Sequence, residues 1–112
     1  MTTSAQIDSG IVAELIERIR EVCAPTRVIL FGSAARGDMR GDSDLDVLVV
    51  VRAGEDRRTI TRAIYRNLIG FGTPADIVVA TEDDLARYGD NFSLVYYPAL
   101  REGKEIYASS TR

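Results

Sequence analysis

The chain has 112 residues, of which 46% are hydrophobic and 28% are charged, and its net charge is −3. This balance predicts one soluble domain over residues 1–112 and argues against generic nucleic-acid binding, which usually requires a basic face. The sequence has no histidine and one cysteine, which excludes His-based triads, His-ligated zinc sites and an internal disulfide. Without a signal peptide or an apolar run of about 20 residues, we expect a cytoplasmic protein with no membrane contact.

The first half of the chain is predicted to contain one helix and two strands. Apolar residues at helical spacing predict a helix over residues 9–23, which Pro25 ends. A buried strand over residues 26–32 is followed by one helical turn and then by a polar loop with two glycines. The apolar run over residues 46–51 predicts a second strand that is covered on both faces.

The second half repeats the alternation of helix and strand. A helix is predicted over residues 55–69 and a strand over residues 75–80. Thr81 is expected to cap a short helix, with Asp84 completing an approximate capping box. A last helical segment over residues 91–101 and a closing strand over residues 104–108 complete the prediction. The fold class is therefore α/β or α+β, a small mixed β-sheet with helices packed on it.

Two aspartates lie one residue apart where the second strand begins. Asp44 and Asp46 project to the same side of a strand, with Leu45 on the other, so their carboxylates lie roughly 5–7 Å apart. Two half-buried carboxylates at this distance repel each other, and a proton, an arginine or a metal ion can relieve the repulsion. Mg²⁺ prefers hard oxygen ligands of this kind.

A phosphate-binding turn is predicted just before this acidic pair. Gly32 and Ser33 end the first strand and open a helical turn, where unpaired backbone N–H groups attract anions. Glycine allows a close approach of a phosphate, and the Ser33 hydroxyl can donate to it. The pattern is neither a Walker A loop nor a Rossmann fingerprint. Asp76 lies at the start of the third strand. If the strands pair side by side, it reaches the sheet edge where Asp44 and Asp46 lie. Three such carboxylates can hold two metal ions.

The stretch "FGSAARGDMRGDSDLDVLVV", with "ADIVV" and "LREGKEIY" further on, resembles the signature of the nucleotidyltransferase superfamily related to DNA polymerase β. In so short a chain it is similar to the minimal nucleotidyltransferase (MNT) proteins. The resemblance implies that Gly32 and Ser33 hold the triphosphate, with Arg36 able to contact it. It also implies that Asp44 and Asp46 hold two Mg²⁺ ions. Asp76 would be the third carboxylate, near the acceptor hydroxyl.

The expected activity is the transfer of a nucleoside monophosphate, AMP from ATP, to a hydroxyl group. MNT proteins are often antitoxins paired with a helical HEPN-type ribonuclease, so the resemblance implies a partner whose tyrosine is the acceptor. One alternative is a module that only masks a toxin. Another is a small-molecule nucleotidyltransferase that works as a homodimer.

Two segments are candidate partner surfaces. Arg58, Arg62 and Arg66 repeat every four residues and form one face of the predicted helix over residues 55–69. Exposed arginines are usually solvated, but an acidic partner or the nucleotide can use them. The second segment carries aromatic residues that suit either a core or an interface, and it comprises Phe92, Tyr96 and Tyr97.

Overall fold

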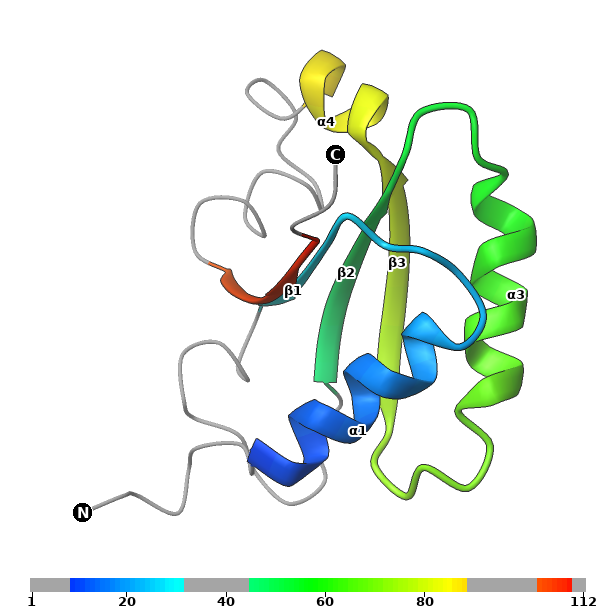
Figure 1. The fold of residues 1–112 in the computed structure, drawn as a ribbon, viewed down its shortest axis with the longest axis vertical. Helices are drawn as coiled ribbons and strands as arrows, with labels where there is room; N and C mark the ends of the chain where they lie inside the picture. The colour runs from blue at the N-terminus through cyan, green and yellow to red at the C-terminus, as the bar shows by residue number, and fades with distance from the viewer. Residues whose placement is uncertain (1–8, 32–44, 89–102, 110–112) are drawn as a thin grey trace.

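A computed structural model of the chain describes residues 9–31, 45–88 and 103–109 (Figure 1). The elements in chain order are α1 (Ser9–Arg20), β1 (Arg27–Phe31), β2 (Leu45–Val51), α3 (Arg57–Asn67), β3 (Ala75–Thr81), α4 (Glu82–Tyr88) and β4 (Lys104–Ala108). Each strand agrees with its predicted span to within a residue or two. The predicted turn, the polar loop and the helix over residues 91–101 lie outside the described residues.

The strands form one mixed sheet in the order β3-β2-β1-β4. Strand β1 pairs antiparallel with both β2 and β4, whereas β2 and β3 are parallel and are joined through α3. A parallel pair needs such a crossover because the chain must return to the same end of the sheet. The expected fold class, a small mixed sheet with packed helices, is confirmed.

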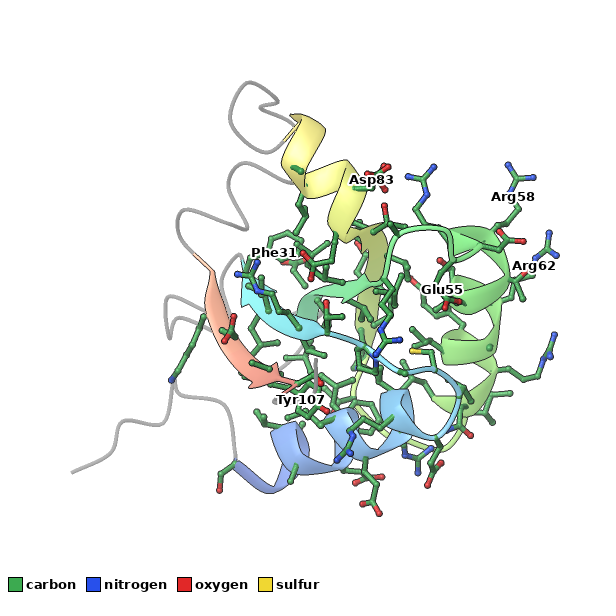
Figure 2. All side chains as sticks on the ribbon, turned by 45° about the horizontal axis from the view of Figure 1, so that its top comes forward. Phe31, Glu55, Arg58, Arg62, Asp83 and Tyr107 are labelled. Atoms are coloured by element: carbon green, nitrogen blue, oxygen red, sulfur yellow. The ribbon has the colours of Figure 1, made fainter. Side chains whose placement is uncertain are left out.

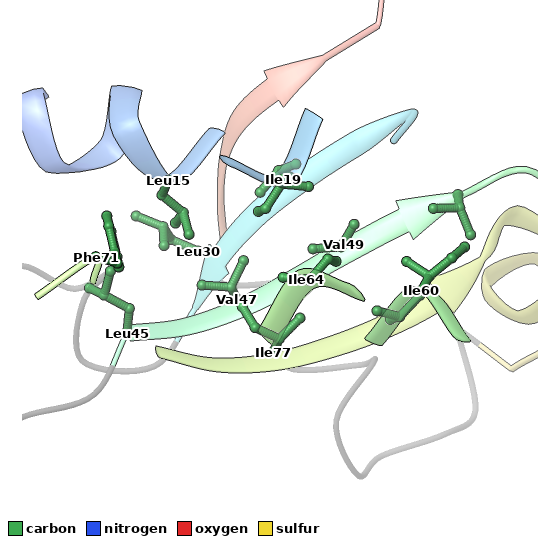
Figure 3. Packing of buried hydrophobic residues seen from close by; sticks show 13 residues of the cluster. Leu15, Ile19, Leu30, Leu45, Val47, Val49, Ile60, Ile64, Phe71 and Ile77 are labelled. Atoms are coloured by element: carbon green, nitrogen blue, oxygen red, sulfur yellow. The ribbon is translucent and has the colours of Figure 1, made fainter. Parts of the chain in front are cut away.

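Alternate residues of β2 are buried on opposite faces of the sheet. Val47 and Val49 belong to the larger core cluster, which α1 and α3 cover, and Figure 3 shows Ile64 of α3 packed among them. Leu48 and Val50 belong to a second cluster on the other face, with Leu85 of α4 packed against it. All four β2 side chains are fully buried, which confirms that this strand is covered on both faces.

Helix α3 is fastened to α1 at its C-terminal end. The guanidinium of Arg18 donates to the carbonyl oxygens of Asn67 and Ile69, at 3.0 and 3.1 Å. The Asn67 side chain donates in return to the Arg18 carbonyl oxygen, at 2.8 Å. These bonds satisfy carbonyl groups that the end of a helix leaves without partners. Gly70, at a φ of 87°, then turns the chain toward β3.

The predicted capping box at the start of α4 is confirmed. The backbone N–H of Asp84 donates to the Thr81 hydroxyl at 3.0 Å, and the Thr81 N–H donates to the Asp84 carboxylate at 3.1 Å. Each side chain thus satisfies a backbone donor of the other residue. No described helix is both long and apolar enough to pass through a bilayer.

Helix α3 begins two residues later than predicted because Asp56 caps it. The Asp56 carboxylate accepts from the backbone N–H groups of Arg58 and Thr59 and from the Thr59 hydroxyl. These hydrogen bonds, first of all those from Thr59, lower the pKa of Asp56 below its ordinary value of 3.8. The charged cap therefore stabilises the fold above pH 3.8, and this contribution is lost as the pH falls through the lowered pKa.

We expect Asp56→Asn to lower the melting temperature at pH 6 and to have a smaller effect at pH 2.5. Asparagine caps a helix without a charge, so the substitution removes only the charge-dependent part of the stabilisation by the cap. Acid removes the same part of the stabilisation from the wild type. Thermal melts of both proteins across this pH range test the prediction. A difference that stays constant with pH would contradict it.

Candidate active site

Two aspartates from neighbouring strands lie side by side in the sheet. In the parallel pairing of β2 with β3, Asp46 is directly opposite Asp76, and on its other side Asp46 is opposite Phe31 of β1. Residues at paired positions of neighbouring strands project to the same face, so both carboxylates lie on one side of the sheet. The Asp46 residue is half-buried, and Asp76 is exposed.

The face that carries these carboxylates is the one that α1 and α3 leave uncovered. Asp46 alternates with Leu45, which is fully buried beneath the helices, and it shares its side with Leu48 of the second core cluster. Asp76 likewise shares its side with Val78, which packs against that second cluster. Within the described residues, α1 and α3 therefore lie on the opposite side of the sheet from the two carboxylates.

The other predicted site residues lie outside the described residues. These are Gly32, Ser33, Arg36 and Asp44. Within the described part of the chain, no group of three or more possible metal-ligating residues occurs. Two carboxylates at paired strand positions supply hard oxygen donors, which are the ligands that Mg²⁺ prefers. The two described members of the three predicted metal ligands, Asp46 and Asp76, thus have suitable chemistry for a divalent cation.

Tyr65 of α3 also belongs to this site, although no sequence pattern predicted it. Its hydroxyl donates to the Asp76 carboxylate at 3.4 Å and accepts from the backbone N–H of Ile77 at 2.8 Å. In the sequence, Tyr65 falls on the polar face of a predicted amphipathic helix. No spacing rule connects such a position with a strand that begins ten residues later.

A basic groove runs beside the edge strand β3. Arg58, Arg62 and Arg66 are all exposed, and Figure 2 shows Arg58 and Arg62 pointing away from the sheet. Arg57, in contrast, pairs with Asp84 of α4 at 3.2 Å. The open groove is lined by Asp56, Arg57, Arg58, Thr61, Arg62 and Val79. Val79 and Asp76 lie on the same strand, but Val79 belongs to the larger core cluster and faces the helices, whereas Asp76 projects to the other face of the sheet.

Cys23 is not suited to act as a nucleophile. Burial, with a smaller contribution from the charge of Glu55, raises the pKa of its thiol to about 11. The thiol donates to the carbonyl oxygen of Ile19 at 3.5 Å. A reactive cysteine requires a lowered pKa, so the thiol is a small packing group at the edge of the larger core cluster.

These features define an α+β domain with a mixed sheet and two aspartates at paired positions on the face opposite α1 and α3. Residues 12–106 match the family model described as a nucleotidyltransferase domain. Since the match spans most of the chain, the protein belongs to this family. Members of the family generally use a nucleotide and a divalent metal ion. None of the curated protein sequences matches the chain significantly.

Solved structures share the fold. A protein assigned as a nucleotidyltransferase from Sulfolobus solfataricus has a TM-score of 0.61 at 20% identity, over 88% of this chain and 78% of that one. A toxin–antitoxin structure with AMP-PNP has a TM-score of 0.61 at 17% identity, over 93% and 76% of the two chains. A mutant of the toxin–antitoxin pair MntA–HpeT has a TM-score of 0.57 at 17% identity, over 94% and 76%. These similarities show that the chain shares the fold of these nucleotidyltransferase and toxin–antitoxin structures.

Proposed function

We propose that the protein transfers AMP from ATP to a hydroxyl group of a partner protein and thereby acts as an antitoxin. The observation that carries the proposal is the pairing of Asp46 with Asp76 on the sheet face opposite α1 and α3, in a nucleotidyltransferase-family domain. A vestigial domain that only masks its partner has no need of two carboxylates at paired strand positions.

In the proposed reaction, the acceptor hydroxyl oxygen attacks the α-phosphorus of ATP. The bond from this phosphorus to the oxygen that bridges to the β-phosphate breaks, and pyrophosphate leaves. Asp76 takes the proton of the hydroxyl, while Gly32, Ser33 and Arg36 hold the triphosphate. Mg²⁺, held by Asp44, Asp46 and Asp76, would supply stabilisation of the negative charge that develops on the phosphate oxygens.

The acceptor proposed here is a tyrosine of a small HEPN-type toxin. The support comes from the two toxin–antitoxin structures that share the fold, one of which contains AMP-PNP. Such a partner can bring the acceptor to the face of the sheet that carries Asp46 and Asp76.

The test is to incubate the protein with α-labelled ATP, Mg²⁺ and the product of the neighbouring gene, and to follow the label. Label on a partner tyrosine, with pyrophosphate released, is the expected result. Label on a small molecule would support the homodimeric transferase instead. Growth rescue by Asp46→Asn in a stoichiometric complex would show that masking suffices, and would overturn the enzymatic antitoxin.

We expect the basic groove to dock the partner. Replacing both Arg58 and Arg62 with glutamate should weaken binding by about 10-fold or more, because charges that attract an acidic surface would then repel it. Wild-type binding should weaken steeply with salt, since exposed charges are screened within about 8–10 Å at ordinary ionic strength. Titration calorimetry with the partner measures both effects.

The control is Lys104→Glu, which reverses one positive charge on β4, at the opposite edge of the sheet. This variant should bind the partner like the wild type. If the Arg58/Arg62 variant and the control bind equally well, the groove is not the docking surface.

A further inference from the structure

Tyr65 lies where α3 meets the edge of the sheet. Strand β3 is an edge strand of the described sheet, and it pairs only with β2. The N–H of Ile77 donates to the Tyr65 hydroxyl at 2.8 Å, which places the hydroxyl beside the backbone of β3. From there it reaches the Asp76 carboxylate oxygen Oδ1 at 3.4 Å. The phenol thus bridges the helix layer and the face that carries the paired aspartates.

The side chain of Tyr65 is held from both of its ends. The helix turn beneath it is fixed by Ile64, which is fully buried against the sheet, and by the Arg18 bonds at the end of α3. The hydroxyl is fixed by the Ile77 N–H, which orients one of its lone pairs and leaves its own proton for Asp76. Tyr65 is 41% exposed, so burial in the core does not account for its position.

We propose that Tyr65 is a positioning residue that orients the Asp76 carboxylate toward the face it shares with Asp46. Asp76 is exposed, so its side chain would otherwise sample several rotamers. A hydrogen bond to Oδ1 restricts these rotamers and leaves Oδ2 for a metal ion or for the acceptor proton. This inference rests on the proposed function, since it matters only if Asp76 acts in the reaction.

The alternative is that Tyr65 only covers an unpaired N–H of an edge strand. Both roles use the same hydroxyl, and Tyr65→Phe removes both. A double-mutant cycle with Asp76→Asn separates them. If Tyr65 acts through Asp76, its effect on metal binding disappears once Asp76 is replaced, whereas two independent effects add.

The experiment measures the affinity of the full chain for Mn²⁺ with saturating AMP-PNP, by titration calorimetry. Amide hydrogen exchange of Ile77 is followed by NMR in the same proteins. We expect Tyr65→Phe to weaken Mn²⁺ binding by about 10-fold, since changes in groups that orient metal ligands cost 10- to 100-fold. In the Asp76→Asn background, the same change should alter the affinity by less than about 2-fold. The Ile77 amide should exchange faster in Tyr65→Phe and at the wild-type rate in Asp76→Asn.

The control is Tyr107→Phe, which removes a hydroxyl from β4 at the other edge of the sheet (Figure 2). It should bind Mn²⁺ like the wild type. Loss of Mn²⁺ binding in Asp76→Asn but not in Tyr65→Phe would overturn the positioning role alone. Additive effects in the double variant would also overturn the positioning role. Tyr65 would then only provide a hydrogen-bond acceptor for the Ile77 N–H of the edge strand. A wild type that binds no Mn²⁺ with AMP-PNP would overturn the proposed function, and the positioning role with it.

Discussion

The Asp46→Asn variant is expected to lose nucleotidyl transfer by about 1,000-fold or more while keeping its fold. Its carboxylate lies opposite Asp76, and an amide of the same shape cannot supply the charge that a divalent cation needs. A loss of this size corresponds to about 4 kcal/mol of transition-state stabilisation, a reasonable amount for a metal-assisted step. The measurement is the rate of label transfer from α-labelled ATP to the partner, with pyrophosphate release as a second readout.

The stability of this variant separates a catalytic role from a structural one. Asparagine keeps the shape of the side chain, so the melting temperature without metal should stay close to that of the wild type. Asp83→Asn is the matched control, because Asp83 is an exposed aspartate of α4, at the far end of β3 from Asp76. An Asp46→Asn protein that melts early, or a wild type that stays active with a chelator, would contradict the prediction.

The Ile64→Ala variant is expected to lose about 3–4 kcal/mol of its free energy of unfolding. Ile64 is fully buried between α3 and the sheet, so truncation removes apolar contacts and leaves a cavity among well-packed neighbours (Figure 3). Domains of this size have a total stability of about 5–15 kcal/mol, so the loss is a large fraction. Urea unfolding, analysed for a lower midpoint at an unchanged slope, measures it.

Ile69→Ala makes the same chemical change just beyond the end of α3, where the side chain is 78% exposed. It should change the stability by no more than about 0.5 kcal/mol, as surface substitutions usually do. If both variants lost a similar free energy of unfolding, the burial of Ile64 would not be what stabilises the packing of α3 on the sheet.

The sequence was sufficient to predict the features that depend on residues close together in the chain. The strands were predicted to within a residue or two because continuous apolar runs and flanking turn residues are local signals. The capping box of Thr81 and Asp84 was predicted for the same reason, as was the burial of β2 on both faces. The family was recognised from the spacing of "GS" and "DLD", which lie on one continuous segment.

The ends of the helices were predicted less accurately than the strands. The first helix was predicted to continue to residue 23 but ends at Arg20, where the chain enters a turn, although Val22 and Cys23 still pack against the core. Hydrophobic periodicity reports which residues are buried, and burial continues past the last hydrogen-bonded turn of a helix. The catalytic roles of Asp44, Asp46 and Asp76 and the triphosphate contacts of Gly32, Ser33 and Arg36 stay predictions.

Only the tertiary structure decided which distant residues meet. That Asp46 lies opposite Asp76 depends on the parallel register of β2 and β3, and a shift of one residue would have turned one carboxylate to the helix face. The contact of Tyr65 with Asp76 and the pairing of Arg57 with Asp84 depend in the same way on where α3 packs. A sequence pattern shows which face of an element is apolar, but register and helix placement are set by packing many side chains together, and no single stretch of the chain encodes that.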